Sequence, residues 1–595
     1  NDDEIDSDDD EYPNEEKVTN EILHKLLVEY YSIESLGISA IETHSTEEEQ
    51  KAIEILKEEM KILDNGTVEA PLVWNRVEKV IPKLPNNYQM VLKRQLATEK
   101  SLQKNPIHLK AYNDNVKELI QNGFLREATE KDMKGGWNNI WYLPMSLTVN
   151  ENKNPPKMRN VYDASCVFRG ESLNKKLLKG PDMLVKILQP LLSMRMNQIA
   201  FTADVKAMFN MIRICERDQQ CQRILWRENI EEPMKTYIAT VMLFGPTSSP
   251  FTSQYVKNTT AELWIDRYPE AAQTLIKQTY MDDVLTSEST VEKALEVAMQ
   301  CIEICKSINW DLVSFQSNSV ELLKSLPPNA VKKDAIPLPG SKSDDPVTKV
   351  LGCFWNTRDD CFEFKLETNL FVKMVRDFNI KPTKRDQSST LARIYDVLGL
   401  ISFFTVRGKI LWQRSWESKL NWDQPVDNKT AKDWKNWLLQ LNEIAKLKFT
   451  RRFAQIDALK NADEIQLHIF CDAGTEAFGT AAYLVVKYNE RIESNLVMAR
   501  AKVTPLRLKT GMKITEMPRL ELLAAVLAAK LCNTIVSLMP DITLTRHFWC
   551  ESEVVIRWIT NPNQKLLKYA IGPVVDILEV TDRCVFTRVR IWSFI

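Results

Sequence analysis

The stretch Tyr280-Met281-Asp282-Asp283 decides how this chain of 595 residues is interpreted. Residues 276–279 and 284–286 flank it and are rich in β-branched side chains, which is typical of strands. Two adjacent carboxylates at the tip of a hairpin would be costly to bury unpaired, so they either face water or hold a cation. A simple Asp-rich turn on the surface is the alternative, because Asp is a favoured turn residue. A third carboxylate on a neighbouring strand would favour the cation.

Such a carboxylate follows another short strand. Residues 200–205 read Ala-Phe-Thr-Ala-Asp-Val, which predicts a strand that carries Asp204 near its end. Magnesium prefers oxygen ligands, and a site for two metal ions needs carboxylates that bridge ions roughly 3.5–4 Å apart. Asp204 beside the hairpin of Asp282 and Asp283 would supply that arrangement.

These two segments resemble the reverse transcriptases of retroelements, whose palm carries one Asp on a strand and a YxDD hairpin. The resemblance implies that Asp204, Asp282 and Asp283 are catalytic and hold two Mg²⁺ ions, with Mn²⁺ as a substitute. It also implies an α+β fold, a right-hand polymerase of fingers, palm and thumb, which acts on RNA and DNA template-primers and dNTPs. An intracellular location in a cytoplasmic particle belongs to the same expectation.

Composition and charge are compatible with that resemblance. Hydrophobic residues make up 44% of the chain and charged residues 27%, as in an ordinary globular protein of several domains. Apolar runs of eighteen residues are absent, so no membrane span is expected. Residues 1–16 hold ten of the 80 acidic residues, and the rest of the chain has 78 basic against 70 acidic residues, a net charge of +8. This mild positive charge suits a groove that binds phosphates.

Two basic residues are the candidates for contact with the incoming nucleotide. Residues 157–163 alternate polar with apolar side chains and predict a strand. Arg159 occupies the place where the resembled family has an arginine on the triphosphate, and Lys157 is a weaker candidate for the same contact. A guanidinium there would bind phosphate oxygens in a bidentate manner. A surface ion pair between Arg159 and Asp163 is the alternative.

Three further residues are expected around the nucleotide. Phe209 lies five positions after Asp204, where the family has an aromatic residue that excludes the 2′-hydroxyl of ribose; a plain core Phe is the alternative. Phe244 and Gly245 begin a loop that leads into a helix after Pro250, and glycine would let the backbone approach a ligand closely. Retroviral enzymes often have Gln before this glycine, whereas retrotransposon enzymes often have Phe.

The primer is expected to contact two hairpins. Tyr280 and Met281 belong to the first, and the second is implied by Leu351, Gly352 and Trp355, which fit the family pattern L-G-x-x-W. One departure concerns residues 310–315, where the family has a lysine at the position of Ser314. Some contact with nucleotide or primer is expected to be lost there.

Residues 383–423 narrow the resemblance to one group. The helix start at Thr383, the segment 394–402 (IYDVLGLIS) and the segment 420–423 (LNWD) are similar to the BEL/Pao group of LTR retrotransposons. In that group the segment follows the polymerase as thumb and connection. The chain therefore resembles the reverse transcriptase and RNase H portion of a BEL/Pao-type Pol polyprotein.

A second set of acids resembles a damaged RNase H site. Residues 465–486 alternate as two strands, with Asp472 as the first metal ligand, and Glu521 would project from a helix as the second. The third ligand is Asp in the family but Glu551 here, and its extra methylene displaces a carboxylate from the geometry that Mg²⁺ requires. A fourth acid has no counterpart before Ile595. We expect an incomplete RNase H-like α/β domain with weak or no nuclease activity; ordinary surface carboxylates are the alternative.

The predicted organisation has six parts. The first is too acidic to fold, and the second contains a helix opened by a capping box at Ser45 and Glu48. Two alternatives to a polymerase remain open, namely a degenerate element copy that only binds nucleic acid and a structural or capsid-associated fragment. The parts are a disordered acidic leader 1–16, a helical linker 17–65, fingers 66–200, palm and primer grip 201–365, thumb and connection 366–460, and an RNase H-like domain 461–595.

Overall fold

The fold is described from a computed structural model of the chain. The structure describes residues 20, 23, 24, 27, 46–137, 139–150, 156–333, 335, 347–364, 381–506, 517–561, 563, 565–581 and 586–588. The predicted acidic leader 1–16 lies outside these residues. The chain divides into two compact units, residues 41–344 and residues 345–595 together with 1–40.

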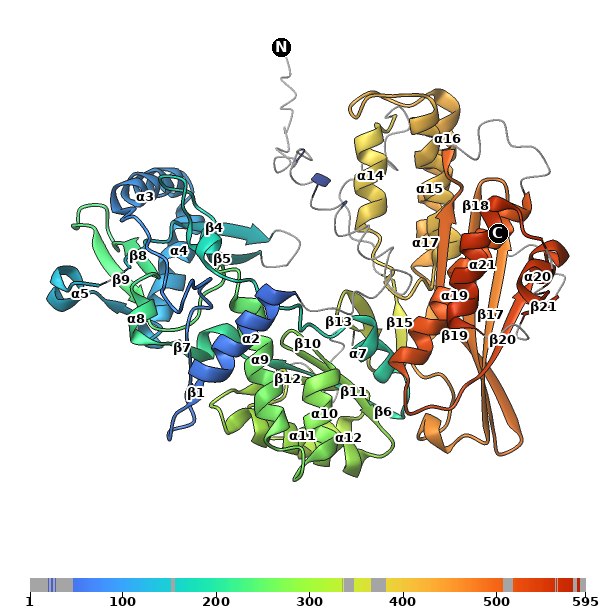
Figure 1. Cartoon of the computed structure of the whole chain (residues 1–595), viewed down its shortest axis with the longest axis horizontal. Coiled ribbons are helices and arrows are strands. Elements are labelled where there is room, and N and C mark those ends of the chain that lie inside the picture. Colours follow the sequence, from blue (N-terminus) through green and yellow to red (C-terminus); the bar gives the residue numbers. More distant parts are fainter. Residues whose placement is uncertain are drawn as a thin grey trace, which may run out of the picture. The chain divides into compact units, whose positions relative to one another are not determined.

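A four-stranded antiparallel sheet forms the centre of the first unit, with strand order β10-β11-β6-β12. Strand β6 is buried along almost its whole length, which explains its run of apolar residues. Figure 1 shows helices α9, α10, α11 and α12 gathered beside this sheet. The elements are β6 Ile199–Val205, α9 Ser249–Glu262, α10 Pro269–Lys277, β10 Thr279–Tyr280, β11 Asp283–Glu288, α11 Val291–Lys306, β12 Leu312–Ser317 and α12 Val320–Ser325.

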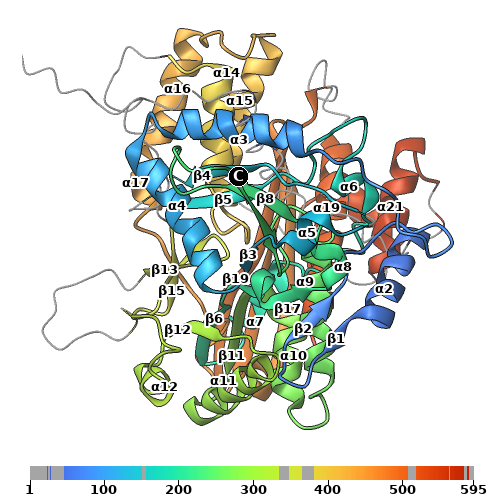
Figure 2. The ribbon, with the colours of Figure 1, turned by 90° about the vertical axis from the view of Figure 1, so that its left-hand side faces the viewer.

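Smaller sheets complete the first unit. Their strand orders are β1-β2-β7, β3-β9-β8 and the hairpin β4-β5. Figure 2 shows helices α3 and α4 near strands β5 and β8, which they contact. The strands are β1 Lys61–Ile62, β2 Val68–Ala70, β3 Leu125–Glu127, β4 Met145–Asn150, β5 Lys157–Tyr162, β7 Ile212–Ile214, β8 Arg223–Trp226 and β9 Lys235–Ala239. The helices are α3 Tyr88–Leu102, α4 Pro106–Gln121, α5 Glu130–Lys134, α6 Leu173–Lys176, α7 Leu188–Ser193, η1 Met208–Met211 and α8 Glu216–Gln219.

Helix α2, Glu47–Glu59, is an integral part of the first unit rather than a bare linker. It buries Ala52, Ile55 and Leu56 in a cluster that includes Phe251 of α9. A capping box opens the helix, but its residues are Thr46 and Glu49, one position after the predicted pair. The prediction missed by one residue because Ser45 and Thr46 can both accept the hydrogen bond of a helix N-terminus.

A mixed five-stranded sheet dominates the second unit, with strand order β19-β18-β17-β20-β21. Strands β17 and β20 are parallel, as are β20 and β21, and the remaining pairs are antiparallel. The elements are β17 Glu464–Ala473, β18 Ala477–Tyr488, β19 Arg491–Val503, α19 Met517–Leu538, β20 Thr545–Cys550, α20 Glu553–Thr560, α21 Lys568–Val580 and β21 Phe586–Arg588.

Helix α19 is the core helix of this sheet. It has 22 residues and a mean hydropathy of 1.6, and by length and composition it could cross a membrane. However, it packs against β17 and β18, and eleven of its residues are buried. Its apolar character is therefore explained by burial against the sheet.

A helical cluster and a smaller sheet complete the second unit. Tryptophans 412, 434 and 437 are buried together in the helical cluster. The sheet has the order β13-β14-β15-β16. The elements are β13 Val347–Val350, β14 Cys353–Asn356, β15 Cys361–Glu363, α14 Lys384–Arg393, α15 Ser402–Glu417, α16 Asn428–Leu439, α17 Leu441–Ile444, β16 Lys448–Thr450 and η2 Leu459–Asn461.

Candidate metal centre

Strand register brings three carboxylates together at one end of the first unit's central sheet. Asp283 of β11 is the direct partner of Asp204 of β6. The amide of Val205 donates to the carbonyl of Asp282 at 2.9 Å, which fixes the hairpin tip against β6. Ligand oxygens of Asp204, Asp282 and Asp283 all lie within 4.8 Å of one another. The structure therefore unites two segments that lie almost eighty positions apart in the sequence.

The hairpin turn itself is strained. Met281 adopts a left-handed conformation with φ of 56°, which is uncommon for a residue other than glycine. The two-residue loop of Met281 and Asp282 needs such a conformation to reverse the chain tightly. Surrounding contacts must hold a conformation of this kind.

Burial raises the pKa of all three carboxyl groups, and repulsion from neighbouring carboxylates raises the pKa of Asp204 and Asp283 further. The pKa of Asp283 rises to about 7, chiefly through burial and then through the charges of Asp282 and Asp204. Burial is also the main cause that raises the pKa of Asp204 and that of Asp282. Three ionised carboxylates this close repel one another, and a bound cation would relieve that repulsion.

Two basic side chains of strand β5 act on this centre through their positive charges. The charges of Lys157 and Arg159 lower the pKa values of Asp204 and Asp282, in opposition to burial. Two basic side chains thus oppose three carboxylates at this centre. The centre thus keeps excess negative charge and offers only oxygen ligands, a set that suits Mg²⁺.

The predicted alternative for Arg159, an ion pair with Asp163, is not what the structure contains. Asp163 instead pairs with Arg94 at 2.9 Å. Arg159 is exposed on the strand that runs antiparallel to β4. Its guanidinium is therefore placed where an anionic ligand could approach.

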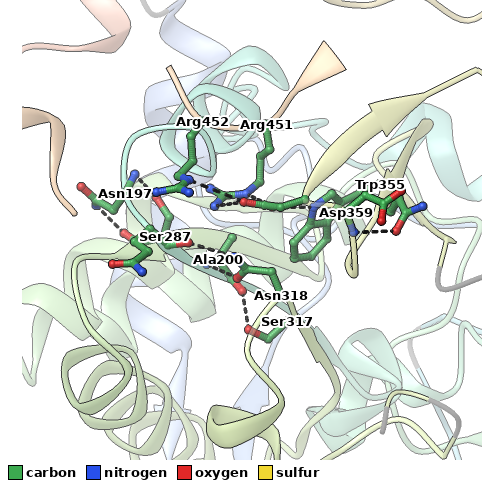
Figure 3. Close-up of polar contacts among 12 residues, drawn as sticks. Asn197, Ala200, Ser287, Ser317, Asn318, Trp355, Asp359, Arg451 and Arg452 are labelled. Carbon is green, nitrogen blue, oxygen red and sulfur yellow. Dashed lines mark hydrogen bonds and ion pairs between the residues drawn. The ribbon is translucent and has the colours of Figure 1, made fainter. Parts of the chain in front are cut away.

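Side chains at the opposite end of the sheet hold its strands in register (Figure 3). The Ser317 hydroxyl of β12 donates to the carbonyl of Ala200 in β6 at 2.6 Å, and the amide of Ala200 donates to Asn318 at 2.9 Å. Asn197 donates through its side-chain amide to the carbonyl of Ser287 in β11, also at 2.6 Å. A slip of one residue in this register would turn Asp204 to the other face of the sheet.

The residues predicted around the nucleotide pack against one another. The ring of Phe209 is only 5% exposed and lies 4.4 Å, between centroids, from the ring of Phe244, which is 51% exposed. Gly245 has φ of +131°, and a Cβ atom there would lie 2.3 Å from the carbonyl oxygen of Tyr162. The close approach that requires this glycine is therefore to the backbone of β5.

Asn174, which the sequence analysis did not single out, anchors the same loop. Its side-chain amide donates to the carbonyl of Gly245 at 3.1 Å, and its side-chain oxygen accepts from the amide of Thr247 at 2.8 Å. Asn174 lies 71 residues before Gly245, so no local pattern points to this contact. The Ser-Leu-Asn sequence at 172–174 shows only a helix cap.

The structure contradicts the prediction that Trp355 contacts the primer. Its side chain is fully buried, and its indole N–H donates to Asp360 at 3.1 Å. Arg451 also donates to this carboxylate, which makes Trp355 part of a packed network. A direct contact between its ring and a primer is therefore excluded, because no ring surface is accessible.

The other predicted primer residues remain partly accessible. Tyr280 and Met281 are half-buried beside the three carboxylates, whereas Leu351 and Gly352 form the turn between β13 and β14 in the second unit. Gly352 has φ of +89°, and a Cβ atom there would collide with the ring of Tyr395. The glycine is thus required by the packing of the turn.

The acids predicted for an RNase H-like centre lie in the second unit. Asp472 is the penultimate residue of β17 and Glu521 projects from α19, and both are half-buried, whereas Glu551 follows β20 and is exposed. Burial and the charge of Glu551 raise the pKa of Asp472. Burial is also the main cause that raises the pKa of Glu521, with repulsion from the other two acids in addition. The three groups are therefore neighbours that feel one another's charge.

This second centre is looser than the first. Across the described ranges, two groups of three residues bring their possible ligand atoms within 4.8 Å of one another. One is Asp204, Asp282 and Asp283, and the second group is Asp359, Cys361 and Glu363. Asp472, Glu521 and Glu551 do not meet this limit. The second group has Lys448 as its counter-charge, since Lys448 pairs with Asp359 and Glu363. Of these two groups of described residues, the one formed by Asp204, Asp282 and Asp283 consists of oxygen ligands throughout, whereas the other contains a cysteine and is ion-paired with a lysine.

Comparisons with known proteins agree with this architecture. Residues 383–552 match the family described as Pao retrotransposon-like RNaseH-like domain. The fold is similar to a foamy viral protease-reverse transcriptase dRH in complex with double-stranded DNA, with a TM-score of 0.51, 13% identity, and coverage of 96% of this chain and 82% of that one.

Two further structures of the foamy viral protease-reverse transcriptase are similar, each with a TM-score of 0.50, 13% identity and 96% of this chain covered. The complex with an RNA/DNA hybrid is covered over 63% of its chain, and a complex with double-stranded DNA over 98%. No curated protein matches the sequence. The chain therefore has a fold similar to that of the foamy viral protease-reverse transcriptase, and its residues 383–552 match the Pao retrotransposon-like RNaseH-like domain, in agreement with the resemblance inferred from the motifs.

Proposed function

We propose that the protein is an RNA-directed DNA polymerase of a BEL/Pao-like retrotransposon, which transfers nucleotides from dNTPs to a primer 3′-hydroxyl. The observation that carries this proposal is the convergence of Asp204, Asp282 and Asp283 within 4.8 Å in a chain with a reverse-transcriptase fold. Carboxylates that come from a strand and from a neighbouring hairpin are the ligand set that two-metal nucleotidyl transfer requires.

The three aspartates would hold two Mg²⁺ ions. When bound, these ions lower the pKa of the primer hydroxyl and stabilise the charge of the leaving pyrophosphate. The protein's part is to hold the carboxylates in place before the ligands arrive, which the register of β6 and β11 achieves. The pKa values raised by burial indicate that these groups are poised to accept a cation in place of protons.

The surroundings of the centre support the same reaction. Lys157 and Arg159 bring positive charge towards the carboxylates, where the triphosphate of a nucleotide would also need it. Phe209 and Phe244 present an aromatic wall in which only the ring of Phe244 is exposed. A wall of this kind favours deoxyribose over ribose where the 2′-hydroxyl would meet a ring.

For the second unit we propose an RNase H-like domain with weak or absent nuclease activity. Asp472 and Glu521 lie close enough to repel each other, but Glu551 is exposed at the end of β20. A longer carboxylate side chain in that place holds a metal ion less rigidly, because Mg²⁺ demands near-ideal octahedral geometry.

Primer extension on an RNA template tests the polymerase. We expect the wild-type chain to extend a DNA primer with dNTPs and Mg²⁺, and Asp282→Asn to reduce the rate by at least about a thousand-fold, as expected for loss of a metal ligand. Asp114→Asn changes an exposed acid on α4 in the same way and should leave the rate unchanged.

Other outcomes point to the other candidate functions. Wild-type protein that binds the template without extending the primer would indicate a degenerate copy that only binds nucleic acid. The slope of its affinity with salt would then count the phosphate contacts. Protein that neither binds nor extends would indicate a structural fragment.

A further inference from the structure

The hairpin that carries Asp282 and Asp283 lies at the edge of its sheet. Among the described strands β10 pairs with β11 alone, so its outer edge has no strand partner. The carbonyl of Gln278 accepts from Leu285 across the pair, which turns the next carbonyl, that of Thr279, to the outer edge. Thr279 is fully buried, so water cannot satisfy this carbonyl.

Helix α9 provides the missing donors. The side-chain amide of Gln254 donates to the carbonyl of Met281 at 3.1 Å, and the ammonium group of Lys257 donates to the carbonyl of Thr279 at 3.3 Å. Gln254 and Lys257 are three positions apart and therefore lie on one face of the helix. They replace a neighbouring strand and tie the tip and the base of the hairpin to the helix.

Burial of the Lys257 amine at this place is unfavourable, because the amine must be desolvated. It is only 3% exposed, and burial lowers its pKa to about 7. An apolar residue of similar size would fill the same space without the cost of desolvating an amine. Among the described residues, the neighbour whose charge acts on this amine is the buried Cys305 and not a carboxylate. Its hydrogen bond to the hairpin is the interaction that distinguishes it from such a residue.

We propose that Lys257 is a positioning residue, whose hydrogen bond to Thr279 holds the hairpin so that Asp282 and Asp283 face Asp204. The inference rests on the proposed function, since it gives the hairpin a metal-binding role. Lys257 touches neither substrate nor metal and acts through the backbone of β10. Its loss should therefore affect the place of the carboxylates more than the stability of the fold.

Amide hydrogen exchange of the metal-free full chain tests the contact without relying on catalysis. Lys257→Met keeps the volume and removes the donor. We expect exchange of the peptide that spans residues 278–285 to rise about ten-fold, with exchange in α10 and α11 unchanged and the melting temperature within about 3 °C of wild type. Lys277→Met, an exposed lysine on α10, is the matched control and should change neither quantity.

The kinetic readouts separate positioning from a general structural role. Lys257→Met should lower kcat about ten-fold and raise the half-saturating Mg²⁺ concentration several-fold, with the KM for dNTP nearly unchanged. Lys257→Gln keeps an N–H donor on a shorter side chain and should lie between Lys257→Met and wild type. It also serves if Lys257→Met does not fold.

Two results would overturn the proposal. One is unchanged exchange in the hairpin of a folded variant, and the other is a rise in exchange spread over α9, α10 and α11 with a matching fall in melting temperature. Absence of primer extension by wild-type protein would instead refute the proposed polymerase, while the exchange result would still stand.

Discussion

Asp283 shows how strongly a single residue depends on its neighbours. Its pKa is raised to about 7, above the ordinary Asp value of 3.8, so in metal-free protein the folded state keeps a proton that the unfolded state has lost between about pH 4 and pH 7. The free energy of unfolding therefore falls as the pH rises through that window. The destabilisation is fully present above pH 7 and disappears below about pH 4.

We therefore expect Asp283→Asn to melt about 2–4 °C higher than wild type at pH 8 without Mg²⁺, because the repelling charge is gone. At pH 4 the two proteins should melt at nearly the same temperature. Addition of Mg²⁺ should stabilise wild type and leave the variant almost unchanged. Thermal melts at pH 4 and pH 8 with and without Mg²⁺ measure all of these differences. A variant that melts lower than wild type at pH 8 would contradict the assignment.

The side-chain length of Glu551 is expected to limit the RNase H-like centre. Glu551→Asp shortens the exposed side chain that follows β20 and restores the aspartate that the resembled family has at this metal ligand. We expect cleavage of an RNA–DNA hybrid to rise several-fold, since metal ligands need tight placement. A gel assay with labelled RNA measures it, with Glu553→Asp, two residues further on, as the control. Lower cleavage in Glu551→Asp would show that Glu551 is a functional ligand rather than a defect.

The loop between Val241 and α9 is held in place by contacts with distant segments of the chain. Gly245 lies against the carbonyl oxygen of Tyr162 in β5, and Asn174 holds the carbonyl of Gly245 and the amide of Thr247. This contact fixes the exposed ring of Phe244 relative to the strand that carries Lys157 and Arg159. The loop of Gly245 is thus positioned by two segments that precede it by more than 70 residues.

Gly245→Ala should disrupt this arrangement. A Cβ atom 2.3 Å from Tyr162 cannot be accommodated without a shift of backbone, and φ of +131° is unfavourable for alanine. We expect a loss of about 1–3 kcal/mol in stability and a rise in the KM for dNTP of about ten-fold. Gly136→Ala is the control, because a Cβ atom there meets nothing within 4 Å. Equal melting temperatures and equal KM values for the two variants would contradict the role of this contact.

At the scale of the whole molecule, the two candidate centres belong to different units. The three close aspartates lie within residues 41–344, whereas Asp472, Glu521 and Glu551 and the match to the Pao family lie within residues 345–595. The hairpin of β13 and β14, which the sequence analysis grouped with the palm, lies in the second unit. Each unit has its own central sheet, and each sheet presents acids at the ends of neighbouring strands.

Much of the local structure could be predicted from the sequence. The strand of Asp204 was expected at 200–205 and spans 199–205, and the helix start expected at Thr383 is the N-cap of α14. These elements have clear local signals, such as the Thr383 hydroxyl that caps the start of α14. Burial was harder to predict: Trp355 was expected to contact the primer and is fully buried, because a local pattern does not tell which segments pack against a residue.

The sequence by itself determined which chemical groups are available. The covalent structure fixes the residue types and their order in YMDD, in the strand of Asp204 and in the Pao-like segment. Only the tertiary structure decided which groups meet. The pairing of Asp283 with Asp204, the burial of Trp355 and the reach of Lys257 to Thr279 all join residues from different elements. Such contacts depend on packing between segments distant in the chain, and no local pattern of residues encodes them.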